Sequence, residues 1–395
     1  MKRNRTSFLA LCLSASLCAT ALAGCGAGST KTATETQSVA QTETQVATET
    51  QTEETDSVDT VAAFPLPEGS EEADIYVEPV ADISDDFIRG MDASEVLVEE
   101  NSGVKYYNYD GEEQDVFMTL AQSGVNYIRL RVWNDPYDEN GNGYGGGNND
   151  IDKAAAIGKL ATNAGMRVLI DFHYSDFWAD PGKQFIPKAW RGYTVEELEK
   201  AVYDYTKETL LDLKKEGLLP DMVQVGNELS NGLLWPYGKV PEYDNIARFV
   251  NAGIRAVKEV SDLALAEGSR QEKILIMIHL DNGGNNDLYR EWFDNFTKRG
   301  EDFDIIGLSY YPFWHGTLDN LASCLNHITE KYGKPVMIAE TSYAYTPNDS
   351  DFFNNTIGEG DGFVRKYPYT VQGQADHVRD VVDTVVNKVD NGIGV

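Results

Sequence analysis

The sequence has 395 residues, with 64 Asp or Glu against 33 Lys or Arg, so its formal net charge at pH 7 is −31. This length suits one large domain with appendages. Nucleic acid and anionic lipid are poor partners for so acidic a chain, because like charges repel, whereas a neutral polysaccharide would not be repelled.

The first 24 residues have the pattern of an export signal. A basic start precedes an apolar run at 8–23, which is too short and too rich in Ser and Thr to predict a membrane span. The run ends in Leu-Ala-Gly-Cys at 22–25, which resembles the lipobox of bacterial lipoproteins. The resemblance implies cleavage before Cys25, acylation of its thiol, and a place on the outer face of the bacterial cell membrane. The alternative is an ordinary secretory signal and a secreted protein.

The stretch that follows the signal is of low complexity. Residues 25–80 include "TATETQSVAQTETQVATETQTEET", which has almost no large apolar side chains. Such a stretch buries too little surface to offset the entropy of ordering, so it predicts a disordered tether. Only Cys324 is left in the mature chain as a free thiol, because Cys12 and Cys18 leave with the signal and Cys25 would carry lipid. We therefore expect no intrachain disulfide, and the scarcity of His and Cys disfavours a structural zinc site.

From about residue 85, short apolar runs alternate with segments of helical periodicity. The predicted strands cover residues 87–92, 125–133, 166–173, 222–227, 273–280, 303–311 and 335–340. The predicted helices cover residues 111–123, 150–164, 195–217, 244–267, 286–299, 317–332 and 371–390. Near-continuous Val, Ile and Leu are typical of buried parallel strands, so these units predict a (β/α)8 TIM barrel over residues 81–395. A doubly wound open sheet is the alternative, but no Gly-rich nucleotide fingerprint follows a strand.

The end of the sequence sets one further expectation. The residues at 391–395, "NGIGV", resemble the beginning of an eighth strand. We therefore expect the eighth strand and its helix to be missing, and the barrel domain to be C-terminally incomplete. A barrel of seven strands would expose two long sheet edges, which is a structural liability.

Two carboxylates lie where a barrel carries its chemistry. Glu228 follows the fourth predicted strand in "DMVQVGNEL", and Glu340 ends the seventh in "KPVMIAETS". The carboxyl ends of barrel strands form the active-site face. Glycoside hydrolysis needs two carboxyl groups across the scissile bond, one to protonate the leaving oxygen and one to attack the anomeric carbon or activate water. A lone strand-end Glu would more simply form a salt bridge, but two such residues favour catalysis.

Longer stretches carry a more specific resemblance. They are "IRGMDASEV" at 88–96, "YIRLRVWNDPYD" at 127–138, "GNNDIDKAAAIGKLATNAGMRVLIDFHYSDFWADPGKQFIPKAW" at 147–190, "VQVGNELSNGLLWP" at 223–236, "SYYPFWHGTL" at 309–318 and "IAETSYAY" at 338–345. Together they resemble glycoside hydrolase family 53, the arabinogalactan endo-β-1,4-galactanases, within the clan of retaining glycosidases whose catalytic Glu residues lie on strands four and seven. The resemblance implies Glu228 as general acid/base and Glu340 as nucleophile.

The supporting residues follow from the same resemblance. Arg131, at the end of the second strand, would hydrogen-bond the nucleophile and keep it ionised, although Arg129 lies on the same strand face and the sequence does not decide between them. Tyr310 resembles the Tyr that bonds the nucleophile. Asn227 resembles the residue that bonds the sugar 2-OH.

Further residues are expected to line the site. His173 would orient a carboxylate or contact sugar, and His279 would line the mouth of the barrel. Trp178 and Trp314 lie on predicted strand-to-helix loops, where an indole can stack on the apolar face of a sugar ring. Asp176 is a candidate partner for a sugar hydroxyl.

The long loop after the seventh strand carries a candidate metal site. Asp349, Asp351 and Asn355 offer oxygen ligands suited to Ca²⁺. The resemblance implies a D-x-D-x-H-x-N calcium pattern here, but Phe353 replaces its His. Structural calcium and a simple Asp/Asn-rich turn are the two alternatives.

The predicted function is retaining endo-hydrolysis of β-1,4-galactan or arabinogalactan side chains of pectin by a monomer that needs no cofactor for its chemistry. Two alternatives remain from the sequence. One is an endo-glycanase of the same clan that acts on another β-glycan. The other is a non-catalytic carbohydrate-binding lipoprotein, which would not require two strand-end carboxylates.

Overall fold

A computed structural model describes residues 75–395, apart from residues 109, 349–354 and 358–365. The signal, the candidate lipidation site Cys25 and most of the predicted tether lie outside this part of the chain, as do Asp349 and Asp351. In the part that is described, no helix has both the length and the apolar character needed to cross a membrane.

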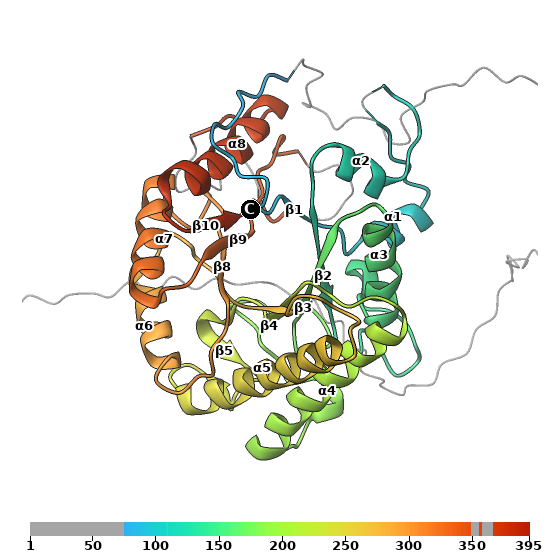
Figure 1. Ribbon diagram of the computed structural model, residues 1–395, viewed down its shortest axis with the longest axis vertical. Helices are drawn as coiled ribbons and strands as arrows, with labels where there is room; N and C mark the ends of the chain where they lie inside the picture. The colour runs from blue at the N-terminus through green and yellow to red at the C-terminus, as the bar shows by residue number, and fades with distance from the viewer. Residues whose placement is uncertain (1–74, 109, 349–354, 358–365) are drawn as a thin grey trace, which may run out of the picture. The chain divides into compact units, whose positions relative to one another are not determined.

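Eight parallel strands form the centre of the domain (Figure 1). They run in the order β1 (Gly90–Asp92), β2 (Tyr127–Val132), β3 (Arg167–Phe172), β4 (Met222–Val225), β7 (Leu275–Leu280), β8 (Ile305–Ser309), β9 (Val336–Glu340) and β10 (Gly392–Gly394). Neighbours in this order are hydrogen-bonded, and most residues of the strands are buried, as expected when helices cover a parallel sheet. A separate two-stranded hairpin, β5 (Gly232–Leu233) and β6 (Gly238–Lys239), follows β4. The predicted (β/α)8 barrel is confirmed.

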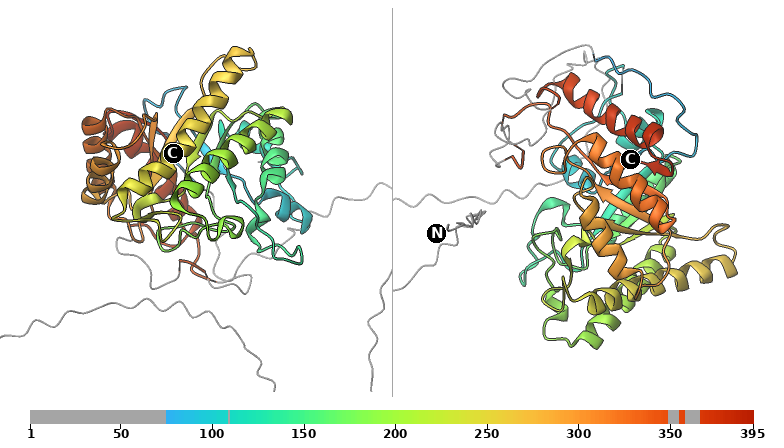
Figure 2. Two further views of the ribbon diagram at one scale, coloured as in Figure 1. Left: turned by 90° about the horizontal axis from the view of Figure 1, so that it is seen from below. Right: turned by 90° about the vertical axis from the view of Figure 1, so that its left-hand side faces the viewer.

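Helices surround the strands. They are α1 (Val96–Asn101), α2 (Val116–Gln122), α3 (Ile151–Asn163), α4 (Val195–Lys215), α5 (Tyr243–Ala266), α6 (Asn286–Phe296), α7 (Leu318–Tyr332) and α8 (Val371–Lys388). Polar side chains fix several helix starts: Asp150 accepts from the Lys153 amide, and Thr194 forms a capping box with Glu197. The side view on the right of Figure 2 shows α8, α7 and α6 in sequence along one side of the barrel. Only the short α1 was not predicted.

The eighth strand is present, so the expectation of an open seven-stranded barrel is wrong. β10 pairs with β9 on one side, and on the other Gly394 bridges to Ile88 beside β1. The Ile88 amide donates to the Ile393 carbonyl at 2.8 Å, and the Val395 amide donates to the Ile88 carbonyl at 3.0 Å. Glycine permits this close approach, because a Cβ on Gly394 would lie 2.4 Å from the Cβ of Ile88. These contacts join the three residues of β10 to the segment beside β1 and close the ring of strands.

Residues 75–80 belong with the barrel rather than with the tether to which the sequence assigned them. The side chain of Gln372 on α8 pairs with the backbone of Tyr76, accepting from its amide at 3.0 Å and donating to its carbonyl at 2.8 Å. Arg379 on the same helix donates to the Glu78 carbonyl at 3.2 Å. The described N-terminal segment is therefore fastened along α8 before the chain enters β1.

The inside of the barrel changes from apolar to polar along the strands. Its apolar layer consists of Ile88, Tyr127, Leu169, Met222, Met277, Ile305 and Met337. Two residues further along β2, β3 and β4, the corresponding side chains are Arg129, Asp171 and Gln224, which bond one another. Because alternate residues of a strand share a face, the fold places a polar layer on an apolar floor at the carboxyl ends of the strands.

Candidate active site

The two predicted catalytic carboxylates meet at the carboxyl end of the barrel. Glu228 directly follows β4, and Glu340 is the last residue of β9. An oxygen of Glu228, an oxygen of Glu340 and a ring nitrogen of His279 all lie within 4.8 Å of one another. Retaining glycosidases hold their two carboxyl groups roughly 5–5.5 Å apart, whereas inverting enzymes leave roughly 6.5–9.5 Å for a water molecule. The spacing therefore fits double displacement through a covalent intermediate.

Glu340 is surrounded by donors. Arg129 donates from Nη2 to Oε1 at 2.9 Å, and the Tyr311 hydroxyl donates to Oε2 at 2.9 Å. Burial opposes ionisation of Glu340, but the Arg129 guanidinium, together with His279 and the Tyr311 hydroxyl, holds the pKa of this carboxyl below its usual value. The group is therefore ionised at neutral pH, as a nucleophile must be.

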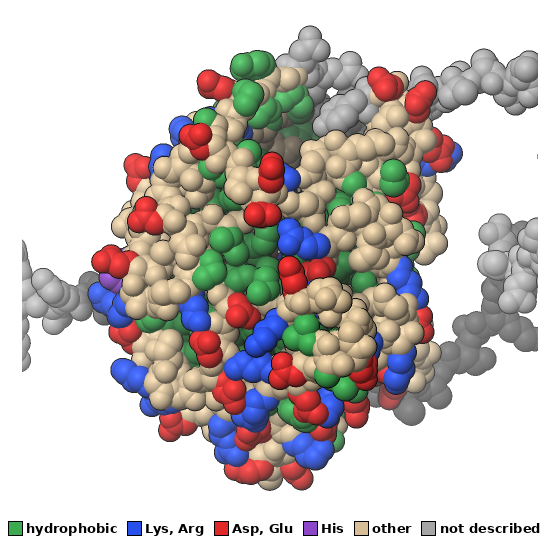
Figure 3. Space-filling view, in the orientation of Figure 1, with side chains coloured by type: hydrophobic (Ala, Val, Ile, Leu, Met, Phe, Trp, Pro, Cys, Tyr) green, Lys and Arg blue, Asp and Glu red, His purple; other side chains and the backbone are tan. Residues whose placement is uncertain are grey.

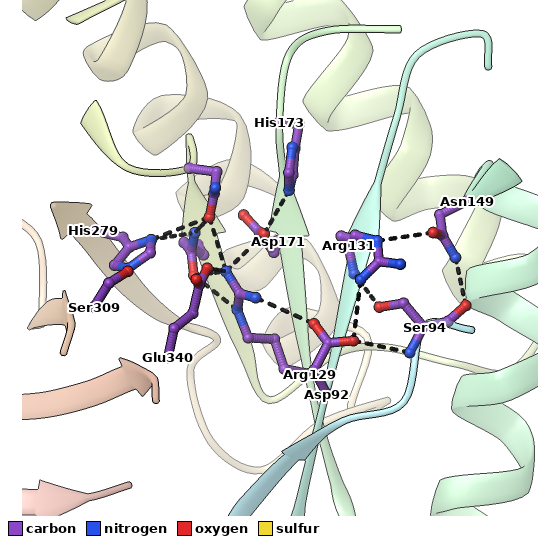
Figure 4. A network of polar contacts seen from close by, with 12 residues as sticks. Asp92, Ser94, Arg129, Arg131, Asn149, Asp171, His173, His279, Ser309 and Glu340 are labelled. Atoms are coloured by element: carbon purple, nitrogen blue, oxygen red, sulfur yellow. Dashed lines mark hydrogen bonds and ion pairs between the residues drawn. The ribbon is translucent and has the colours of Figure 1, made fainter. Parts of the chain in front are cut away.

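Arg129 is itself fixed by a network of acids and amides, which Figure 4 shows. Its Nη2 lies 2.9 Å from Asp171 Oδ2 and donates to Asn227 Oδ1 at 2.9 Å, and its Nη1 lies 3.2 Å from Asp92 Oδ2. Gln224 Oε1 accepts from its Nε at 3.2 Å. Because the guanidinium is bonded from several sides, it can hold Glu340 in a single orientation.

Glu228 has the opposite surroundings. Its side chain is 9% exposed, and Oε1 accepts a hydrogen bond from Ser309 Oγ at 2.7 Å. In the described part of the chain it forms no salt bridge. Burial, and then the negative charge of Glu340, raise the pKa of Glu228 far above that of an ordinary carboxyl group. Glu228 therefore keeps its proton where Glu340 is ionised, the arrangement that an acid and a nucleophile require.

The backbone of Glu228 is held in an unusual conformation. Its φ of 50° and ψ of 58° lie in the left-handed region, which non-glycine residues rarely adopt. The buried Gln184, from the loop after β3, donates from Nε2 to the Asn227 carbonyl at 2.8 Å and the Glu228 carbonyl at 3.4 Å. This amide ties the acid residue to the neighbouring loop. Gln184 could not be predicted from the sequence, because nothing in a loop sequence indicates which backbone carbonyls a side chain will reach.

The guanidinium that bonds Glu340 belongs to Arg129, so the contact predicted for Arg131 is wrong. Arg131 donates instead to Asn149 at 2.9 Å and pairs with Glu95, and its guanidinium lies 4.1 Å from the centre of the Trp178 ring. Both arginines point inward from β2, but Arg131 is one layer closer to the loops. There the residues after β1 and β2 bind it, so it lines the entrance to the site.

Tyr311, and not Tyr310, bonds Glu340. Tyr310 is 1% exposed and donates to the Gly316 carbonyl at 3.0 Å, with its ring stacked near His377. Ser309, at the end of β8, faces Glu228 inside the barrel. Because successive side chains alternate, Tyr310 then points outward and Tyr311 inward. Counting from an inward-facing Ser309 would have found the correct residue.

His173, Asn227 and His279 lie in the buried layer around the carboxylates. His173 Nε2 lies 3.0 Å from Asp171 Oδ2, so it orients the acid that binds Arg129. Asn227 accepts from Arg129 through Oδ1 and donates through Nδ2 to the Ala179 carbonyl at 2.9 Å. Both ring nitrogens of His279 take part in hydrogen bonds to protein groups. His279 therefore cannot serve as a metal ligand in this arrangement, despite its closeness to the two carboxylates.

The remaining predicted residues are spread over the loops. Trp178 lines the cavity beside Glu340, whereas Trp314, after β8, is 45% exposed. Asp176 accepts from the Lys188 amide at 2.7 Å, which gives it a part in fixing the loop after β3. Asn355 donates to the Asn348 carbonyl at 3.0 Å; the other two proposed calcium ligands are not in the described residues.

A cavity of about 440 Å³ adjoins Glu340. Polar lining comes from Asp92, Arg129, Arg131, Tyr311 and Glu340, with Trp178 beside them, and the other walls are largely apolar. The face seen in Figure 3 shows hydrophobic side chains beside acidic and basic ones near its middle. Polar groups on an apolar surface suit a sugar, which presents hydroxyls at its rim and C–H groups on its faces.

Comparison with known proteins now identifies the family. A family model described as glycosyl hydrolase family 53 matches residues 88–395. The chain belongs to this family. It is 47% identical over 322 residues to the endo-beta-1,4-galactanase of Bacillus subtilis, covering 82% of this chain and 72% of that protein.

Two further family 53 comparisons agree. An arabinogalactan endo-beta-1,4-galactanase of Humicola insolens is 35% identical over 312 residues, which cover 78% of this chain and 87% of that protein. The solved GH53 catalytic domain of Ignisphaera aggregans superposes with a TM-score of 0.75 at 41% identity, covering 81% of this chain and 87% of that one. The family resemblance inferred from the sequence motifs is confirmed.

Proposed function

We propose that this chain is a retaining endo-β-1,4-galactanase acting on galactan or arabinogalactan. The observation that carries the proposal is the pair of carboxyl groups whose oxygens lie within 4.8 Å, one held ionised and the other protonated. The family 53 relatives named as galactanases support the choice of substrate. The acidic surface of the chain is compatible with a neutral polysaccharide.

The geometry supports two steps. In the first, Glu340 attacks the anomeric carbon while Glu228 gives its proton to the leaving glycosidic oxygen, which leaves a galactosyl group esterified to Glu340. In the second, Glu228 is a carboxylate and takes a proton from water as that water attacks the anomeric carbon and releases Glu340. Each displacement inverts the configuration of the anomeric carbon, so the two steps together retain the β-configuration.

The supporting residues have separate tasks in this reaction. Arg129 and Tyr311 keep Glu340 ionised and oriented before attack and stabilise it again when it departs. Arg131 and Trp178, at the wall of the cavity, are placed to contact sugar. No cofactor is needed for the chemistry, because the two carboxyl groups supply both the proton and the nucleophile.

We also propose export of the protein with a lipid anchor at Cys25, on the basis of the signal pattern and its terminal cysteine. A monomer tethered to the outer face of the membrane would release oligosaccharides close to the cell. Structural calcium bound by Asp349, Asp351 and Asn355 is a second proposal about this chain, and it rests on the oxygen-rich sequence of that loop.

The test of function is reducing-end release from linear β-1,4-galactan, with cellulose and mannan alongside. We expect galacto-oligosaccharides from galactan alone, and none from Glu340→Gln. Cleavage of cellulose or mannan instead would retain the mechanism and reject the substrate. A folded protein that binds galactan without cutting it, and binds equally well as Glu340→Gln, would support a carbohydrate-binding role and contradict the proposal.

A further inference from the structure

A buried hydrogen-bond chain behind Glu228 fixes the tautomer of His279. His279 Nδ1 lies 3.3 Å from the backbone nitrogen of Glu228 and 3.0 Å from Gln224 Nε2. Asn227 Oδ1 also lies 3.2 Å from Nδ1, but it already accepts from Arg129 and Gln224, whereas a backbone N–H can only donate. Nδ1 therefore accepts, and a neutral ring then carries its proton on Nε2. Burial lowers the pKa of His279 to about 4, so the ring stays neutral near neutral pH.

The same chain fixes the direction of the Ser309 hydroxyl. The protonated Nε2 of His279 lies 2.9 Å from Ser309 Oγ, and Ser309 Oγ lies 2.7 Å from Glu228 Oε1. A hydroxyl has one proton. Since its oxygen accepts from His279, Ser309 donates that proton to Glu228 Oε1. The three residues therefore donate in one direction, and both His279 and Ser309 are completely buried.

We propose that His279 and Ser309 are positioning residues that keep the acid proton of Glu228 on Oε2 rather than Oε1. Oε1 accepts a hydrogen bond from the Ser309 hydroxyl, so a proton bound to Oε1 would lie close to the proton of that donor and be repelled by it. Oε2 has no hydrogen-bond partner among the described residues. It is also not buried, because it is absent from the buried side-chain atoms that lack a partner. It is therefore the carboxyl oxygen open to a substrate. The proposal rests on the acid/base role of Glu228 given above.

The chain would act in both steps of the reaction. In the first step, the proton leaves from the oxygen that can reach the leaving group, so no rotation of the carboxyl group is required. In the second step, Ser309 donates to the newly formed carboxylate and stabilises it. The remaining groups that act on Glu228 are Glu340 on β9, Asp281 after β7, Arg129 on β2, and the phenols Tyr289 and Tyr311. The hydrogen bond from Ser309 favours the ionised form of Glu228, because it lowers the pKa of that carboxyl.

The test removes the hydroxyl by Ser309→Ala in the full chain. Two substrates are compared: galactan, whose leaving sugar needs a proton, and a dinitrophenyl β-galactobioside, whose leaving group does not. We expect kcat/KM on galactan to fall about 10- to 100-fold, as for a misdirected general acid. On the aryl substrate it should fall less than about threefold, because acid catalysis is not required there. The alkaline limb of the galactan pH profile should move to higher pH, since a donor to the Glu228 carboxylate has been lost.

Ser261→Ala is the matched control. Ser261 is also buried, but its hydroxyl accepts from the amide of Ile274, directly before β7, at the opposite end of that strand from His279. It should leave both activities and the alkaline limb unchanged. If Ser309→Ala does not fold, Ser309→Cys, a weaker donor of similar size, should show the same pattern in smaller measure.

Equal losses on both substrates with an unmoved alkaline limb would overturn the proposal and leave Ser309 with a structural role only. This result differs from a failure of the proposed function, in which the unaltered protein would not hydrolyse galactan at all.

Discussion

Glu228 and Glu340 are the same kind of side chain at the ends of two barrel strands, yet the groups that contact them differ in charge. Glu340 is contacted by the Arg129 guanidinium and the Tyr311 phenol, and Arg129 is also paired with Asp171 and Asp92. Glu228 is contacted by a neutral hydroxyl and is close to a negative charge. Burial opposes the charge of both, but of the two only Glu340 is in direct contact with a cation among the described residues.

The difference shows how one chemical group takes two roles. A carboxyl group needs a cationic neighbour to remain ionised in a buried site, and without one it keeps its proton. Activity should therefore require a pH above the pKa of Glu340 and below that of Glu228. Since the first pKa is lowered and the second is raised, the predicted pH profile is broad, with Glu340 setting its acid limb and Glu228 its alkaline limb.

The largest effect should come from removing the nucleophile. Glu340→Gln keeps the shape of the side chain but cannot form the ester, so kcat on galactan should fall by at least about 10⁴-fold. The measurement is reducing-sugar release, with circular dichroism to show that the variant is folded. Activity within tenfold of the unaltered protein would contradict the assignment.

Removing the acid should give a smaller and more selective loss. Glu228→Gln should lower kcat/KM on galactan by about 10²–10⁴-fold. On a dinitrophenyl β-galactobioside the first step should be almost unaffected, which a measurement of the dinitrophenol burst can show. An equal loss of the burst on the aryl substrate would mean that Glu228 does not act as the acid.

The two adjacent tyrosines offer a matched pair. Tyr311→Phe removes a donor from Glu340 and should raise the pKa of that carboxyl, so the acid limb moves to higher pH and kcat/KM falls roughly tenfold. Tyr310→Phe removes a hydroxyl that bonds the Gly316 carbonyl and should leave the acid limb in place. The two variants are compared by the pH dependence of kcat/KM, and a shift of the acid limb in Tyr310→Phe alone would contradict the hydrogen bond between Tyr311 and Glu340.

The smallest predicted loss concerns the backbone of Glu228. Gln184→Ala frees the carbonyls of Asn227 and Glu228 and should lower kcat on galactan by about tenfold or less, with KM little changed. Asn231→Ala is the control, because Asn231 also joins the loops after β3 and β4, through the Pro181 carbonyl, without touching the acid residue. Equal effects from both variants would show that loop stability, and not the position of Glu228, is what matters.

Much of the fold could be predicted from the sequence, because apolar strands and helical periodicity alternate along the chain. The same pattern places Glu228 and Glu340 at strand ends. The sequence indicates the beginning of an eighth strand at 391–395, but not that three residues are enough to complete the sheet, since the closure depends on backbone contacts that glycines permit. Helix α1, with six residues, is likewise too short to show a periodicity.

The residues that surround the two carboxylates were harder to predict than the carboxylates themselves. Choosing Arg129 over Arg131 depends on which loop residues reach each guanidinium, and a sequence does not contain that distance. Ser309, Asp171 and Gln224 did leave a signal, because each is a polar residue in an otherwise apolar strand. Such residues face the barrel interior, where only a bonded network can hold them.

The central claim is that Glu340 forms a covalent bond to the sugar while Glu228 supplies the proton. A 2-deoxy-2-fluoro-β-galactobiosyl substrate with a dinitrophenyl leaving group slows the second step and should trap the intermediate. Peptide mass spectrometry of the trapped protein is the most direct measurement. The account predicts the added mass of the fluorinated disaccharide on the peptide that contains Glu340. A label on Glu228, or turnover that yields the α-anomer with no label, would contradict it.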